Sequence, residues 1–154
     1  MLSIPLPASP KITLHKTSDG YVIRDNEKNM KMSLSFDDYS KIILDNKKHQ
    51  LNKIFKAKNS SILDCTGGFA RDAAVLASLG NNVTLVDRDP LIMSLLVDAR
   101  EKIKSDDIRY IFSRIKIRFG NCIEFIRNTS KHFDYIYFDF MFNINKSALP
   151  SKNE

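Results

Sequence analysis

Residues 61–73 combine an acidic side chain, glycines and other small residues in a spacing that could hold a ligand. The segment reads Ser-Ile-Leu-Asp-Cys-Thr-Gly-Gly-Phe-Ala-Arg-Asp-Ala, with small residues at every second position after Asp64, namely Thr66, Gly68 and Ala70. Its apolar start and alanine-rich continuation predict a strand, a turn and a helix, which bring backbone amides to a ligand at the carboxyl edge of a sheet. The spacing differs from the G-x-G-x-x-G of dinucleotide-binding turns. A plain tight turn, in which glycine supplies only backbone freedom, is the alternative.

Polar residues also follow the second and third expected strands. Asp87 follows the apolar stretch 82–86, and a carboxylate at such a strand end can accept hydrogen bonds from both hydroxyls of a ribose. Gly120 and Asn121 follow the third strand, 115–119, where a backbone amide and a side-chain amide could read the edge of an adenine. The alternatives are a helix-capping or turn acid at Asp87 and a simple strand-ending turn at Gly120.

A further carboxylate, Asp139, ends the fourth expected strand, 133–140, and is followed by Phe-Met-Phe. A carboxylate among apolar side chains is costly to desolvate, so we expect it to have a hydrogen-bonding partner or a functional role. Candidates at four successive strand ends, in this order, favour a shared adenosyl ligand over four unrelated turns.

The elements that must position these residues alternate strand and helix from residue 61 onward. After the first strand and turn we expect a helix at 72–79, a strand at 82–86, a helix from Asp89-Pro90 to near Lys104, a strand at 115–119, a helix at 122–127 and a strand at 133–140. This alternation predicts a parallel sheet with right-handed crossovers. We therefore expect an α/β fold, a partial Rossmann-like sheet with strand order 3-2-1-4 and helices on both faces. The fourth strand is apolar enough for burial on both of its faces.

The N-terminal third has a different pattern. Residues 1–10 hold three of the five prolines and predict an irregular lead-in. Short alternating apolar pieces in 11–36 predict two or three small strands, with a hairpin-like turn at Asp19-Gly20. A helical pattern follows from Asp37 to about residue 55, as one helix or as two pieces, since 45–50 is wholly polar. We divide the chain into a basic N-terminal extension, 1–58, and a ligand-binding domain, 59–154.

The charge and composition of the chain indicate which kinds of partner it could bind. The net charge is +6 with a sequence pI near 9.3, and residues 1–58 hold eleven Lys and Arg against six Asp and Glu, whereas 59–154 hold thirteen against twelve. A basic flank beside a nearly neutral module favours a polyanion such as RNA, with a solvated lysine-rich surface as the equal alternative. Neither a membrane span nor a secretory leader is visible, so we expect a cytoplasmic protein. Cys65 and Cys122 lack a C-x-x-C spacing and are expected to be buried, reduced thiols; we expect no metal site.

Three segments together resemble one known family. The spacing of Asp64, Gly68 and their neighbours is similar to the first motif of class I S-adenosylmethionine methyltransferases, whose turn passes under the methionine part of the cofactor. Residues 64–80 are also similar to a motif of the RsmJ family, Asp-Ala-Thr-Ala-Gly-Leu-Gly-Arg-Asp-Ala-Phe-Val-Leu-Ala-Ser-Leu-Gly, in which Arg-Asp is the most specific pair. Residues 83–90 match that family's segment with Glu-Arg-x-Pro. Asp139-Phe-Met-Phe followed by 146–149 matches Asp-Pro-Met-Tyr followed by Lys-Ser-Ala-Leu.

The RsmJ family methylates the exocyclic amine of a guanine in 16S ribosomal RNA with S-adenosylmethionine, and the resemblance implies the same substrate and cofactor here. Matched position by position, the cofactor-binding residues implied are Gly68, Arg71, Asp72, Asp87, Arg88, Gly120, Asn121 and Asp139. Asp139 would also face the target amine and orient its lone pair, so that rate comes from positioning and electrostatics. An aromatic side chain at Phe142 could stack on the extruded base, for about 1–3 kcal/mol.

This chain departs from the family pattern at two positions and in length. Phe140 stands where the family has Pro, Phe142 stands where Tyr is usual, and the chain stops at Glu154, just after the fourth strand. That strand is then an exposed apolar edge. Either a partner covers it, such as a second copy of the chain by self-association, or the protein is a shortened remnant.

Three functions follow, in order of preference. The first is an S-adenosylmethionine-dependent rRNA guanine-N2 methyltransferase, acting on 16S rRNA or the small ribosomal subunit. The second is a catalytically inactive, truncated domain that retains cofactor or RNA binding. The third, a nicotinamide-dependent oxidoreductase, is disfavoured by Ala70, by the Arg71-Asp72 pair and by the absence of a substrate domain.

Overall fold

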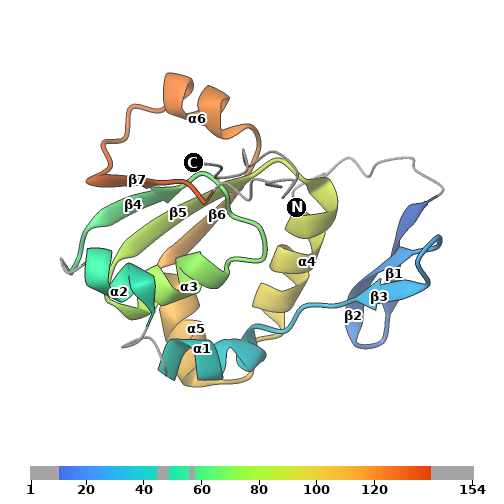
Figure 1. The fold of residues 1–154 in the computed structure, drawn as a ribbon. Helices are drawn as coiled ribbons and strands as arrows, with labels where there is room; N and C mark the ends of the chain where they lie inside the picture. The colour runs from blue at the N-terminus through green and yellow to red at the C-terminus, as the bar shows by residue number, and fades with distance from the viewer. Residues whose placement is uncertain (1–10, 45–48, 56–57, 140–154) are drawn as a thin grey trace, which may run out of the picture.

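A four-stranded parallel sheet forms the centre of the molecule. The computed structural model describes residues 11–44, 49–55 and 58–139. The strands are β4 (Ser61–Asp64), β5 (Asn82–Asp87), β6 (Ile115–Phe119) and β7 (Tyr135–Tyr137), side by side in the order β6-β5-β4-β7. All three strand pairs are parallel, so the carboxyl ends of the strands meet at one edge of the sheet (Figure 1).

Helices cover both faces of this sheet unequally. Helices α3 (Arg71–Ser78), α4 (Pro90–Glu101) and α5 (Asp106–Ser113) pack their apolar side chains with Ile62, Val83, Leu85 and Ile115 in one buried cluster. Helix α6 (Cys122–Asn128) lies on the opposite face, where it is the only helix among the described residues (Figure 1). The expected α/β class with a parallel sheet is confirmed.

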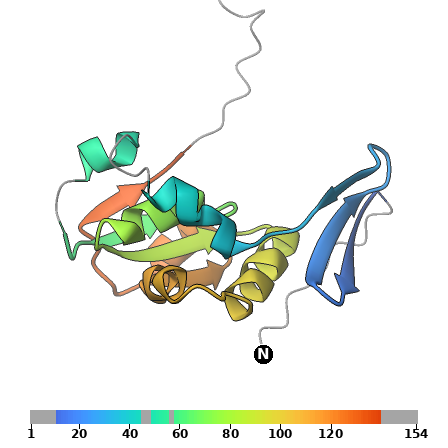
Figure 2. The same cartoon turned by 90° about the horizontal axis from the view of Figure 1, so that it is seen from below.

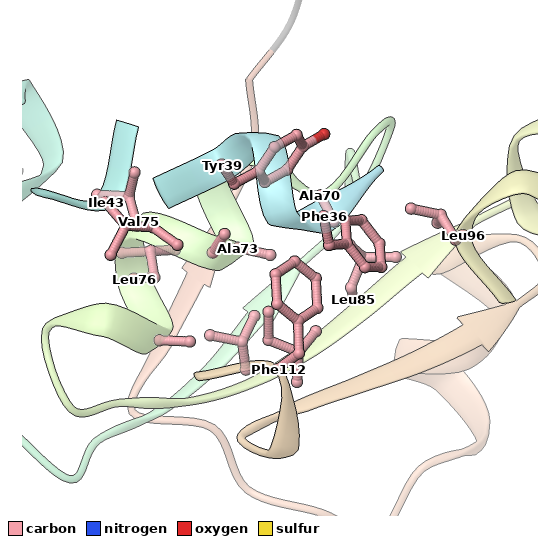
Figure 3. Close-up of a cluster of buried hydrophobic side chains, with 14 of the residues drawn as sticks. Phe36, Tyr39, Ile43, Ala70, Ala73, Val75, Leu76, Leu85, Leu96 and Phe112 are labelled. Carbon is pink, nitrogen blue, oxygen red and sulfur yellow. The ribbon is translucent and has the colours of Figure 1, made fainter. Parts of the chain in front are cut away.

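The segment before the parallel sheet forms short helices that pack against the main core. It contains the short 3-10 helix η1 (Phe36–Tyr39), α1 (Ser40–Leu44) and α2 (Gln50–Ile54), so the helical pattern is divided into pieces. Phe36 is 1% exposed and stacks on Phe112 of α5, with ring centroids 3.9 Å apart. Figure 3 shows these rings together with Tyr39 against the start of α3. The N-terminal segment therefore supplies part of the core on which the parallel sheet rests.

A second sheet, which is antiparallel, precedes these short helices in the chain. It consists of β1 (Ile12–Thr17), β2 (Gly20–Asp25) and β3 (Met30–Met32), and both views place it beside α4 (Figures 1 and 2). Asp98 of α4 accepts a hydrogen bond from Tyr21 N at 3.1 Å, and Lys102 Nζ donates to Asp19 O at 3.0 Å. These contacts join the expected small strands to the main body. In the described part of the chain, no helix is long and apolar enough to cross a membrane.

Two expectations about the later elements are wrong. The fourth strand is only three residues long, and Tyr135 and Ile136 are 42% and 51% exposed, so β7 is an edge strand and is not buried on both faces. Helix α5 was not expected at all. Ser105 caps it by accepting from Ile108 N at 3.4 Å, and Ile108 and Phe112, four residues apart, are buried. The new helix begins after the short segment 102–105 because Ser105 is a good N-cap residue.

Candidate functional site

A pocket of about 420 Å³ opens at the carboxyl edge of the parallel sheet. Its lining comes from four places that are far apart in the sequence: Cys65, Thr66 and Gly68 after β4; Val86, Asp87 and Arg88 at the end of β5; Gly120, Asn121, Cys122 and Ile123 after β6; and Phe138 after β7. Five of the expected cofactor residues thus line one cavity, and Arg71, Asp72 and Asp139 lie outside its lining. The site is where open α/β sheets bind their ligands.

The turn after β4 is shaped by close packing. A Cβ on Gly67 would lie 2.5 Å from the Leu85 side chain, and Leu85 is fully buried, so only glycine lets the turn lie this close to β5. Gly68 has φ 44° and Ala70, the residue before α3, has φ 61°, both in the left-handed region. The turn is closed by a 2.8 Å hydrogen bond from Ala70 N to Gly67 O. The glycines therefore serve packing and backbone conformation in addition to any ligand.

Asp87 is held by two backbone amides. Its carboxylate accepts from Gly68 N at 2.7 Å and from Asp89 N at 2.8 Å, one amide on each oxygen. An ionised carboxylate has about four acceptor sites, so about two remain for a ligand in the pocket that Asp87 lines. The arrangement suits a ligand with a pair of neighbouring hydroxyl groups.

Gly120 and Asn121 form the opposite wall. Gly120 has φ 147° and donates its N–H to Asp87 O at 2.9 Å, which joins the ends of β5 and β6. Asn121 caps α6, because its Oδ1 accepts from Ile123 N at 2.8 Å. The cap uses the side-chain oxygen, whereas the amide nitrogen is the group that can donate to a ligand. Asn121 therefore caps α6 at the end of the strand, which is a structural role, and it also lines the pocket.

Arg71 and Asp72 begin α3 beside two tyrosines, Tyr39, which is buried, and Tyr137, which is partly buried. Tyr137 of β7 donates its hydroxyl to Asp72 at 2.8 Å, and Tyr39 donates to Phe69 O at 2.6 Å. Burial raises the pKa of the Tyr137 hydroxyl, and the Asp72 carboxylate raises it further, so Tyr137 remains a donor. Burial also raises the pKa of Tyr39, partly offset by the nearby Arg71. These tyrosines, which sequence reasoning missed as site residues, hold the start of α3 against β7 and η1.

Asp139 lies at the edge of the turn. Its backbone N–H donates to Thr66 Oγ1 at 2.8 Å, and Thr66 Oγ1 donates to Asp64 at 3.4 Å. The side chain of Asp139 is exposed. Phe142, the expected stacking residue, and Phe140 lie outside the described residues.

Asp64 is a buried acid that the sequence analysis did not include among the site residues. It is 1% exposed and accepts from Thr66 N at 3.0 Å. Burial, assisted by the carboxylates of Asp72 and Asp87 and partly offset by the hydrogen bonds from Thr66, raises its pKa to about 6. The turn is thus surrounded by acids, and such a site favours a cationic ligand. Among residues 11–44, 49–55 and 58–139, no three His, Cys, Asp or Glu side chains are grouped to hold a metal ion.

The pKa of Asp64 leads to a prediction about stability. Because the folded-state pKa of about 6 lies above the ordinary 3.8, the folded protein keeps a proton between these values that the unfolded chain has lost. The stabilisation is complete below about pH 4, falls as the pH rises to about 6, and amounts to about 3 kcal/mol. Asp64→Asn lacks this titration, so its free energy of unfolding relative to wild type should rise by about 2–3 kcal/mol from pH 4 to pH 7. Urea unfolding at both pH values measures the difference, and an unchanged difference would refute the assigned pKa.

The expectation of two buried, reduced thiols is wrong. Cys65 and Cys122, 57 residues apart, form a disulfide with their Cα atoms 5.4 Å apart. Both residues are partly exposed and line the pocket. They meet because the carboxyl end of β4 and the start of α6 lie at the same edge of the sheet, a proximity that spacing along the sequence does not show.

Comparisons with known proteins agree with this geometry. Residues 7–154 match the family described as "Putative SAM-dependent methyltransferase". Two relatives named ribosomal RNA small subunit methyltransferase J are 39% identical over 97 residues (Shewanella sediminis) and 43% identical over 94 residues (Ectopseudomonas mendocina). A solved SAM-dependent methyltransferase from Neisseria gonorrhoeae is 24% identical, with a TM-score of 0.70 over 92% of this chain and 60% of that one.

A parallel sheet with a ligand pocket at its carboxyl edge defines the class as an α/β protein of the Rossmann-like type. The match over residues 7–154 is then decisive: the chain belongs to the SAM-dependent methyltransferase family, and it is similar to relatives named ribosomal RNA small subunit methyltransferase J. The expected resemblance is confirmed. The two alignments cover 61% and 59% of this chain but only 38% and 36% of the relatives.

Proposed function

We propose that this chain binds S-adenosylmethionine in the pocket and transfers its methyl group to the exocyclic N2 amine of a guanine in 16S rRNA. The observation that carries the proposal is the carboxylate of Asp87, fixed by Gly68 N and Asp89 N at the end of β5. A carboxylate held in this way can accept from both ribose hydroxyls of an adenosine. The named relatives, which are small-subunit rRNA methyltransferases, support the choice of substrate.

The residues present fit this cofactor. A pocket of about 420 Å³ lies within the usual range for small-molecule sites. Gly68 has open space where a Cβ would lie, with only Thr66 O at 3.7 Å. When bound, S-adenosylmethionine supplies an activated methyl group on a positively charged sulfur. The buried Asp64 and the neighbouring Asp72 and Asp87 place negative charge where such a cation is favourable.

The other proposed cofactor residues act from the rim. Arg88 is exposed and lines the pocket beside Asp87. Arg71 and Asp72 hold the start of α3, and Asp72 is fixed by the Tyr137 hydroxyl. Asn121 offers its amide nitrogen to the adenine. We propose that these residues set the orientation of the cofactor and that Asp87 contributes most of its affinity.

Asp139 is the proposed residue for the target amine. The lone pair of an exocyclic amine is delocalised into the base, so the amine is a poor nucleophile. A carboxylate that accepts its N–H groups can turn the lone pair toward the methyl donor. Asp139 is exposed, follows Phe138, which lines the pocket, and is anchored through its backbone to Thr66. Phe142 follows it in the chain and is proposed to stack on the base.

The N-terminal extension, 1–58, is proposed to hold the RNA. Its antiparallel sheet and the turn between β2 and β3 carry exposed basic side chains next to domain 59–154, namely Lys16, Arg24, Lys28 and Lys31. Lysine and arginine bind RNA through phosphates, and such binding weakens with salt. Ribosomal RNA as substrate implies a cytoplasmic protein.

The experiment is methyl transfer from tritiated S-adenosylmethionine to 16S rRNA and to small ribosomal subunits, followed by nuclease digestion and identification of N2-methylguanosine. Asp139→Ala should lower the methylation rate about 10²–10³-fold while changing cofactor affinity less than about tenfold. Asp107→Ala removes an equally exposed carboxylate on α5 and should leave the rate unchanged. If folded wild-type protein binds the cofactor but methylates neither RNA, the proposed activity is wrong.

A further inference from the structure

The disulfide between Cys65 and Cys122 joins two walls of the cofactor pocket. Cys65 follows Asp64 at the end of β4, and Cys122 is the first residue of α6, next to Asn121. The Cα–Cα distance of 5.4 Å is within the usual range for a disulfide. Both residues line the pocket and are partly exposed. The pair is therefore accessible to a small thiol or disulfide that enters from the pocket side.

Within the described part of the chain, few other contacts hold helix α6 against the sheet. None of its residues is buried, and Ile123 and Ile126 are 59% and 38% exposed. A tilted ring contact between Phe125 and Phe133, with centroids 6.3 Å apart, joins the helix to the segment before β7. In contrast, α3 on the other face contributes five consecutive buried residues to the core. The covalent bond at Cys122 therefore adds a strong restraint on the first turn of α6, beyond the hydrogen bond from Gly120 N to Asp87 O.

That first turn is part of the site. Gly120, Asn121, Cys122 and Ile123 form the wall opposite Gly68 and Asp87. If the wall is free to move, ligand binding must first order it, and this ordering lowers affinity. If the wall is already fixed before the ligand arrives, binding does not include this ordering cost. The redox state of the cysteine pair therefore controls how well the pocket is preorganised.

We propose that Cys65 and Cys122 are a reversible thiol–disulfide site and that the disulfide form binds the adenosyl cofactor more tightly than the dithiol form. In the oxidising direction, one cysteine thiolate attacks a small-molecule disulfide such as glutathione disulfide, forms a mixed disulfide and releases one thiol. The second thiolate attacks the mixed disulfide and releases a second thiol. The balance is two cysteine thiols and one external disulfide converted to one protein disulfide and two external thiols. This inference rests on the proposed function of the pocket.

The first test compares cofactor affinity in the two redox states. Wild-type protein is equilibrated with glutathione disulfide or with dithiothreitol under argon, and mass spectrometry verifies the loss of two hydrogen atoms on oxidation. Isothermal titration with S-adenosylmethionine should give a dissociation constant about five- to tenfold lower for the oxidised protein. Cys65→Ala and Cys122→Ser should bind like reduced wild type in both conditions. Equal affinity of the two wild-type states, tighter binding by the reduced state, or failure of the disulfide to form would each overturn the proposal.

A second measurement separates this proposal from the proposed function. Amide hydrogen exchange of residues 121–128 without cofactor should be slower in oxidised than in reduced wild type, and the same in both conditions for Cys65→Ala. Slower exchange without cofactor binding in either state would support the redox site and overturn the function proposed for the pocket. Equal exchange in both states would show that the disulfide does not hold the wall, and the inference would fail.

Discussion

Replacing Asp87 with alanine is expected to weaken S-adenosylmethionine binding by at least about 100-fold. A charge-assisted hydrogen bond contributes about 1.5–3 kcal/mol, and the carboxylate can accept two from the ribose, so the loss is about 3–6 kcal/mol. The substitution also leaves Gly68 N and Asp89 N without the acceptor that fixes the turn. Isothermal titration with S-adenosylmethionine and S-adenosylhomocysteine measures the effect.

The control for this result lies two residues away. Asp89→Asn removes the same charge, but Asp89 caps α4 through its side chain and does not line the pocket. Asparagine is an equally good N-cap residue, so both stability and affinity should stay close to wild type. If Asp87→Ala, shown to be folded, binds within threefold of wild type, the ribose does not contact this carboxylate. If Asp89→Asn loses as much affinity as Asp87→Ala, the lost affinity reflects the overall negative charge near the pocket and not a specific contact of Asp87 with the ribose.

Replacing Phe36 with alanine is expected to lower the free energy of unfolding by about 3–5 kcal/mol. Phe36 is 1% exposed, stacks on Phe112 and makes an edge contact with Tyr39 at a centroid distance of 5.5 Å. Its removal leaves a cavity between η1 and α5 that this close-packed core fills only in part. Because Tyr39 donates to Phe69 O in the turn after β4, where we propose that the cofactor binds, we also expect weaker cofactor binding. Urea denaturation followed by circular dichroism gives the stability change.

Met30→Ala is the comparison for Phe36→Ala. Met30 lies in the same N-terminal third, on β3, but is 57% exposed, so its truncation should cost less than about 1 kcal/mol. Equal small costs at the two positions would mean that the N-terminal segment is only loosely attached. The large difference that we expect would show that residues 1–58 include part of the methyltransferase core in addition to the proposed RNA-binding sheet.

The strands and the strand-end residues could be predicted because their signals are local. Asp64, Asp87 and Asn121 each follow a short apolar run, and parallel strands bring such positions to one edge without further information. The start of α4 was predicted for the same reason, since Asp89 and Pro90 form a strong N-terminal signal.

The features that were missed depend on contacts between distant segments. Cys65 and Cys122 are 57 residues apart, and only the folded sheet edge places them together. The bonds from Tyr137 to Asp72 and from Tyr39 to Phe69 also cross between elements. The prediction that β7 is buried on both faces was wrong, although the same strand was also expected to be an exposed apolar edge, because a run of aromatic and aliphatic residues indicates a strand but does not show what covers it. Helix α5 is different, since its cap and the spacing of Ile108 and Phe112 are visible in the sequence, but the expected helix ended near Lys104 and no element was assigned to the residues between it and the strand at 115–119.

The most direct test of the central claim, that this pocket binds S-adenosylmethionine, is isothermal titration of the folded, oxidised protein with that cofactor and, separately, with NADH. We expect binding of S-adenosylmethionine with a dissociation constant on the order of micromolar and no measurable binding of NADH. Because the titration requires no RNA, it tests the glycine turn, Asp87 and Asn121 independently of the substrate. Absence of S-adenosylmethionine binding, or preferential binding of NADH, would contradict the claim.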